Sequence, residues 1–170
     1  MESVEEFLSY AIKLEEEAAL RFGQLADVMA TGGNIEVSKL FRRLSDYSRL
    51  HLNVARARAG FRQLPEMRPG DYQWPDIESP ETTSIWVADP LIGRGEALQV
   101  ALESESAGLA YYQSILDTTK DPEIRALAKE FVEEESQHVA ELQRWIASHA
   151  AGLEKPQEKT TLRLRQTQKT

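Results

Sequence analysis

Apolar residues recur every three or four positions in four segments of the chain, a spacing typical of amphipathic helices. Local signals mark the ends of these segments. Thr31-Gly32-Gly33 stops the first, Asn34 can cap the second, and Asp121-Pro122 opens the fourth with a capping residue and a proline. The expected helices cover about 4–30, 34–60, 94–116 and 121–149. The pattern predicts an all-α protein.

The two halves of this pattern are copies of each other. Asn34-Ile35-Glu36-Val37 matches Asp121-Pro122-Glu123-Ile124, and each stretch lies the same distance before a histidine. Short loops make each half an antiparallel hairpin. The link between the hairpins, about 61–93, is far longer than the usual loop of a helical bundle. The sequence therefore predicts an antiparallel four-helix bundle with a long crossover between helices 2 and 3.

The expected organisation is one helical domain, residues 1–152, followed by a tail. With 170 residues and 41% hydrophobic content, the chain is long enough to bury a four-helix core. Trp74 and Trp86 are expected to pack the crossover onto the bundle. Residues 153–170 are polar and basic, a composition typical of disorder.

Two glutamates occupy helix faces that should be apolar. Glu15 and Glu105 stand at corresponding positions of the two hairpins, and the residues sharing their faces are almost all apolar. Around Glu15 these are Leu8, Ala11, Ile12, Ala18, Ala19 and Phe22; around Glu105 they are Leu98, Ala101, Leu102, Gly108, Leu109 and Tyr112. Both carboxylates are therefore expected to point into the core. Tyr112 could hydrogen-bond a ligand or simply pack there.

Each hairpin also carries a histidine three residues after a polar residue. The second hairpin reads Glu135-Ser136-Gln137-His138, and the first reads Ser48-Arg49-Leu50-His51, with serine where the repeat predicts glutamate. A buried ionised carboxylate costs several kcal/mol unless a cation or hydrogen bonds compensate it. A metal ion would supply that compensation. Carboxylate and imidazole ligands suit iron or manganese, and zinc is an alternative.

Composition narrows the classes of function further. The chain has no cysteine, which excludes disulfides, iron–sulfur clusters and a rubredoxin domain within it. The net charge is −8, and because residues 154–170 contribute +3, the preceding residues carry −11. Such an acidic body argues against nucleic-acid binding. The N-terminus has no basic signal region, and no apolar run approaches the ~18 residues of a membrane span, so we expect a cytoplasmic protein that does not enter membranes.

These residues make the chain resemble the rubrerythrin-like branch of the ferritin-like di-iron carboxylate superfamily, over about residues 4–150. In such bundles two helices each give one Glu and the other two each give Glu-x-x-His. The resemblance implies a ferritin-like bundle whose metal ligands are Glu15, His51, Glu105, Glu135 and His138. It further implies one or two iron ions, reduction of peroxide or oxygen with electrons from an external donor, and a homodimer.

The chain departs from that pattern at two positions. Ser48 stands where a bridging carboxylate is expected, and Gly108 stands where rubrerythrins place a further carboxylate. A single metal held by Glu105, Glu135 and His138 is one expectation. Three functions remain open: a rubrerythrin-like oxidoreductase, a non-catalytic metal-binding protein, and a structural bundle with a degenerate site.

Overall fold

The computed structural model describes residues 1–76, 78–84 and 88–152 of the chain, which contain four long helices. They are α1 (Val4–Thr31), α2 (Ile35–Ala59), α3 (Arg94–Thr118) and α4 (Pro122–Ala150), with a short 3-10 helix, η1 (Pro69–Asp71), between α2 and α3. No strand occurs in those ranges. The prediction of an all-α four-helix bundle is confirmed.

The helix ends follow the local signals in the sequence. The side chain of Asn34 accepts a hydrogen bond from the amide of Val37 at the start of α2. The side chain of Asp121 caps α4 by accepting from the amides of Glu123 and Ile124. These caps satisfy backbone N–H groups that have no partner inside a helix. Each helix therefore begins within a residue or two of its predicted start.

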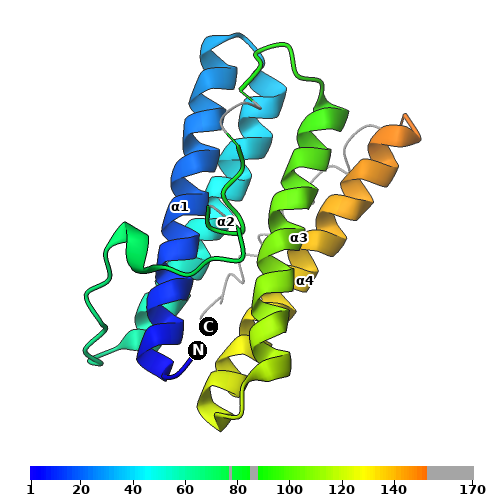
Figure 1. Cartoon of the computed structure of the whole chain (residues 1–170). Coiled ribbons are helices and arrows are strands. Elements are labelled where there is room, and N and C mark those ends of the chain that lie inside the picture. Colours follow the sequence, from blue (N-terminus) through cyan, green and yellow to red (C-terminus); the bar gives the residue numbers. More distant parts are fainter. Residues whose placement is uncertain (77, 85–87, 153–170) are drawn as a thin grey trace, which may run out of the picture.

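The helices form two antiparallel hairpins, α1 with α2 and α3 with α4, packed side by side (Figure 1). The crossover leaves the end of α2 and travels the length of the bundle to reach the start of α3 (Figure 1). It is fastened beside the α1–α2 turn, where the amide nitrogen of Asn34 donates to the carbonyl of Ile92 at 2.8 Å. Because the crossover spans the whole bundle, α2 and α3 run in the same direction.

The core consists of two apolar clusters separated along the bundle axis. One contains Phe7, Leu14, Ala55, Tyr112 and Phe131, among others. The other contains Phe22, Phe41, Leu44, Leu98 and Leu142, among others. Every long helix contributes apolar residues to both clusters. In the stretch between its two apolar regions, each helix carries one or more buried polar residues. This polar layer comprises Glu15, Ser48, His51, Glu105 and Glu135, together with the less buried His138.

The first part of the crossover packs against α1 and α3 through aromatic rings. The ring of Trp74 lies 5.0 Å from that of Tyr10 and 5.6 Å from that of Tyr111, centroid to centroid. The predicted packing of Trp74 onto the bundle is confirmed. Trp86 and the predicted tail at 153–170 lie outside the described residues. Within the described residues, no helix combines the length and apolar character needed to cross a membrane.

Candidate metal centre

The five residues expected to bind metal lie at one level of the bundle, in the polar layer. Glu15 and Glu135 have no exposed surface, and Glu105 and His51 are also buried. His138 is half-buried. Each long helix contributes at least one of these side chains, because their sequence positions place them on inward faces between the two apolar clusters.

Two imidazoles and one carboxylate form a first group of potential ligands. Ligand atoms of His51, Glu135 and His138 all lie within 4.8 Å of one another. Nδ1 of His51 is 2.8 Å from Oε1 of Glu135. The two imidazole rings stack with centroids 4.8 Å apart and planes inclined by 1°. One histidine from each hairpin is therefore within reach of the same carboxylate.

Three carboxylates form a second group. Oxygens of Glu15, Glu81 and Glu135 lie within 4.8 Å of one another, and all three residues are buried. Glu81 belongs to the crossover and was not among the ligands expected from the sequence. Glu135 belongs to both groups. It is thus the carboxylate that the two groups share.

Glu105 has a supporting position. In the part of the chain that the structure describes, it enters neither three-residue group. Its Oε2 instead lies 3.3 Å from Nδ1 of His138. A carboxylate in contact with one nitrogen of a ligand histidine fixes the orientation of the ring and raises its basicity. Of the set expected to hold a single ion, Glu135 and His138 share a group with His51, and Glu105 contacts His138.

Four carboxylate oxygens in the centre have no hydrogen-bond partner among the described residues, and we call them the open oxygens. They are Oε2 of Glu15, Oε1 of Glu81, and both oxygens of Glu135. The approach of His51 to Glu135 is an ion-pair contact without hydrogen-bond geometry. Because buried polar atoms are nearly always paired in proteins, four open oxygens converging in one place fit a site that binds a cation.

The pKa values of the buried groups also indicate that the centre needs a compensating positive charge. Burial raises the pKa of Glu15, Glu81 and Glu135, and for Glu81 the negative charges of Glu15 and Glu135 raise the pKa further. Burial would lower the pKa of His51, but the carboxylates of Glu135 and Glu15 outweigh it and raise the pKa to about 11. Without a cation, the cluster therefore retains protons. A metal ion would replace those protons as the compensating positive charge.

The two residues expected beside the ligands also lie in the centre. Ser48 is buried on α2, one turn before His51. The hydroxyl of Tyr112 donates to Oε1 of Glu15 at 3.3 Å, so the second hairpin holds a carboxylate of the first. Phe22, which corresponds to Tyr112 in the repeat, packs in the apolar cluster around Phe41.

Two acidic neighbours of the centre were missed by sequence reasoning. Oε2 of Glu134 lies 3.6 Å from Nε2 of His51, and it too is buried without a hydrogen-bond partner among the described residues. Glu81 was missed because the crossover has no helical period from which its direction could be read. A signal was nevertheless present in Gly108, since glycine inside a helix often marks a close approach by another group.

The centre reaches the surface at His138. This residue lines a cavity of about 560 Å³ together with Tyr47, Glu141 and Arg144. The ring of Tyr47 stacks on that of His138 with centroids 4.6 Å apart. The hydroxyl of Tyr47 donates to Oε2 of Glu141 at 3.2 Å. His138 is therefore the part of the centre that a small molecule can approach from this cavity.

The fold and the cluster define an all-α four-helix bundle with a carboxylate and histidine centre suited to metal ions. No protein-family model matches the chain, and no curated protein matches it. Among solved structures, it is similar to the crystal structure of COG1633, an uncharacterized conserved protein from Magnetospirillum magnetotacticum MS-1. The two sequences are 30% identical, the match covers 91% of this chain and 97% of that chain, and the TM-score is 0.67. The chain belongs to the COG1633 family.

Proposed function

We propose that this protein is a metal-dependent oxidoreductase of the rubrerythrin type, which holds iron inside the bundle and reduces peroxide or oxygen. The observation that carries the proposal is the convergence of the four open oxygens with two histidines around Glu135. This donor set matches the chemistry of the ion, because carboxylate-rich ligation with imidazole suits iron or manganese, with zinc as an alternative.

The residues around such a centre would have two roles, binding the metal and orienting a ligand. Glu15, Glu135, His51 and His138 would bind the metal, and Glu105 would orient His138 through the 3.3 Å contact. When bound, iron supplies reversible one-electron redox chemistry. The apolar clusters on both sides keep bulk water away from the buried carboxylates. The cavity beside His138 gives peroxide or oxygen a route from the surface.

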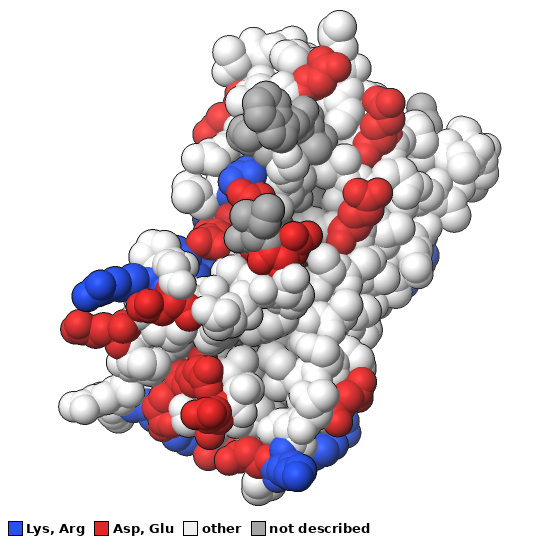
Figure 2. Space-filling view, viewed as in Figure 1, with Lys and Arg blue, Asp and Glu red and all other residues white. Residues whose placement is uncertain are grey.

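The surface charge supports capture of a cation. Acidic side chains are more prominent than basic ones on the face crossed by the crossover (Figure 2). A field of this sign raises the local concentration of metal ions. The reducing electrons would come from an external donor protein. A homodimer is the assembly implied by the resemblance to rubrerythrins.

The test is peroxide-dependent oxidation of bound ferrous iron, measured by stopped-flow absorbance on anaerobically loaded protein. Wild-type protein should oxidise its iron rapidly on adding peroxide, and Glu135→Ala should neither retain the iron nor show the rapid phase. Glu133→Ala is the matched control, since Glu133 lies on the same helix with its side chain exposed and paired with Lys129. Unchanged oxidation in Glu135→Ala would refute the proposal.

Ser48 favours a second candidate, a protein that binds one metal ion without turnover. A serine at this buried position removes one negative charge and one bridging group from the ligand set expected of the fold. If the protein holds a single ion, Ser48→Glu should raise the metal content from about one to about two per chain, with no peroxide-dependent oxidation before the change. A wild-type protein that already binds two ions and oxidises them would exclude this candidate.

A further inference from the structure

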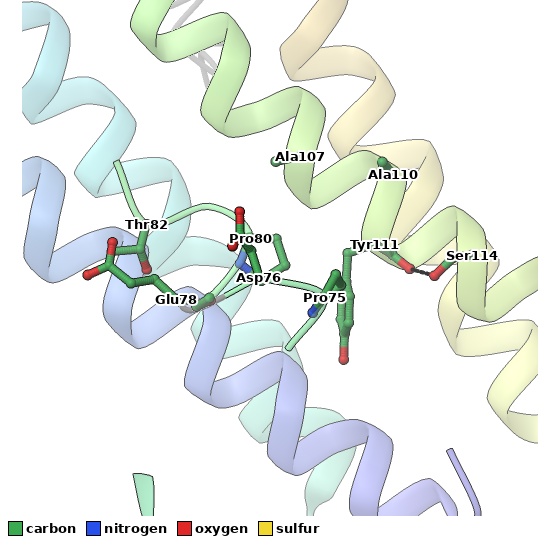
Figure 3. A pocket seen from close by; sticks show the side chains of 10 residues that line it. Pro75, Asp76, Glu78, Pro80, Thr82, Ala107, Ala110, Tyr111 and Ser114 are labelled. Atoms are coloured by element: carbon green, nitrogen blue, oxygen red, sulfur yellow. Dashed lines mark hydrogen bonds between the residues drawn. The ribbon is translucent and has the colours of Figure 1, made fainter. Parts of the chain in front are cut away.

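Glu81 is the residue of the crossover that turns towards the metal centre. It is 2% exposed, although it lies in a segment that runs along the outside of the bundle between α1 and α3 (Figure 1). The residues on either side of it, Pro80 and Thr82, line a cavity of about 730 Å³ whose other wall includes Ala107 and Ala110 of α3 (Figure 3). The crossover therefore separates this outer cavity from the centre, and Glu81 points away from it.

Two helices hold the crossover in place around Glu81. The hydroxyl of Ser104, next to Glu105 on α3, donates to the backbone carbonyl of Glu81 at 2.5 Å. The guanidinium of Arg21 on α1 donates to the carbonyl of Thr83 at 2.5 Å. These contacts fix the backbone at Glu81 itself and two residues after it. The position of Glu81 is thus built into the fold.

α3 leaves room for this carboxylate at Gly108. A Cβ atom on residue 108 would lie 1.8 Å from Oε1 of Glu81 and 2.5 Å from its Cδ, so any larger residue there would force the end of the Glu81 side chain out of this position. Glycine in a helix interior is about 1 kcal/mol less favourable than alanine. α3 is therefore locally less stable at Gly108, the position where the carboxyl group of Glu81 packs against it. Gly108 and Glu81 therefore form a matched pair.

The carboxylate of Glu81 is directed at the other ligands. One of its oxygens lies within 4.8 Å of oxygens of Glu15 and Glu135, and its Oε1 is one of the open oxygens. A fully buried acidic group that faces two other acids, with no partner for Oε1 among the described residues, needs a cation or a proton. Packing alone gives no reason for an acid at this position.

We infer that Glu81 is a metal ligand, delivered by the crossover, that supplies a carboxylate to a two-metal centre in place of the one missing at Ser48. With it, the centre gathers four carboxylates and two imidazoles, the number that two-metal bundles of this fold use. Glu15, Glu81, Glu135, His51 and His138 would bind the ions, and Glu105 would orient His138. The inference rests on the proposed function, because it requires that the bundle binds metal.

The experiment measures ferrous iron binding to the full-length, metal-stripped protein, by metal analysis per chain and by competition with a chelator. Wild-type protein should bind about two ions. Glu81→Gln, which keeps the shape of the side chain, should bind one ion normally and the other at least 10-fold more weakly. The same variant without metal should melt at a higher temperature than wild type, because a neutral amide replaces a buried carboxyl group that must either hold a proton or repel Glu15 and Glu135. A residue that only packs would not combine those two effects.

A second variant displaces the carboxylate without removing it. Gly108→Ala should push the end of the Glu81 side chain aside and weaken the same ion by a similar factor. Two controls are available. Gly95→Ala places a methyl group on the same helix against the exposed His149, and Glu78→Ala removes an exposed crossover acid that pairs with Arg21. Both should bind iron as wild type does.

The outcomes separate this inference from the proposed function. If Glu135→Ala loses its iron while Glu81→Gln and Gly108→Ala bind two ions with wild-type affinity, Glu81 is not a ligand and the proposed function stands. If wild-type protein binds no iron, manganese or zinc, both are wrong. If it binds only one ion, and Glu81→Gln leaves that ion unaffected, the two-metal assignment is overturned while metal binding remains.

Discussion

The two hairpins carry corresponding histidines in different surroundings. His51 of the first hairpin is 9% exposed in its side chain and approaches three carboxylates, those of Glu135 at 2.8 Å and of Glu15 and Glu134 at 3.6 Å. His138 of the second hairpin is 17% exposed and approaches Glu105 at 3.3 Å, beside an open cavity. A repeated sequence motif has thus produced one enclosed imidazole and one accessible imidazole.

This difference shows that a duplicated pattern need not give a symmetric centre. The first hairpin carries serine where the second carries Glu135, and its histidine uses the carboxylate of the second hairpin instead. The remaining acid comes from the crossover, which belongs to neither repeat. The two hairpins are therefore equivalent in their backbone and unequal in their chemistry.

The largest effect is expected when Glu135 of the second hairpin and Ser48, the corresponding residue of the first, are each replaced by alanine. Glu135→Ala should lower the affinity for iron by at least 100-fold, because both ligand groups contain Glu135. Ser48→Ala should change the affinity by less than about threefold, since a serine hydroxyl is a poor metal ligand. Chelator competition measures both. Comparable losses in the two variants would mean that the hairpins contribute equally after all.

A smaller effect is expected in the pH dependence of the metal-free protein. Glu81 and Glu135 have pKa values raised above 4.5 by burial, and neighbouring carboxylates raise the pKa of His51 from 6.5 to about 11. Above pH 4.5 the folded state therefore binds more protons than the unfolded chain. Its free energy of unfolding should fall as pH rises, by up to about 1.4 kcal/mol per pH unit for each extra proton.

Urea denaturation at a series of pH values, with a chelator present, measures this slope. His51→Gln removes the contribution of the first hairpin's histidine and should flatten the fall between pH 6.5 and 11. Saturating metal should reverse the slope, because the cation binds the deprotonated ligands. A metal-free stability that increases with pH over this range would contradict the arrangement described.

The smallest effect concerns the hydrogen bond between the hairpins. Tyr112→Phe removes the donor to Glu15 and should lower the free energy of unfolding by about 1 kcal/mol. Tyr111→Phe is the matched control, since the buried hydroxyl of Tyr111 has no partner within the described part of the chain. It should cost nothing or stabilise slightly. Thermal melting of both variants measures the difference, and equal shifts would show that the Tyr112 bond contributes no stability.

Most of the fold could be predicted from the sequence, because helices are specified locally. The apolar period placed all four long helices, and caps such as Asn34 and Asp121 fixed where two of them begin. The inward direction of Glu15 and Glu105 followed from the apolar residues on their faces. Both are buried as expected. These features depend on positions a few residues apart.

The composition of the centre could be predicted only in part. Helical period says which face a residue occupies, but it gives neither the rotation nor the distance between two helices, so the pairing of His51 with Glu135 was not foreseen. Glu81 depends on the path of an irregular segment held by Ser104 and Arg21, two contacts that link distant parts of the chain. No local pattern encodes such a path.

The crossover also determines when the centre can form during folding. Each hairpin joins neighbouring helices through a short turn, so it can assemble from local contacts, which form early. The first hairpin alone offers only Glu15 and His51, too few donors to retain an ion. The carboxylate of Glu81 reaches its position only after α3 has emerged and presented Gly108. Metal capture by the proposed centre would therefore be a late event, so that an incompletely folded chain would not trap cations in an incomplete site.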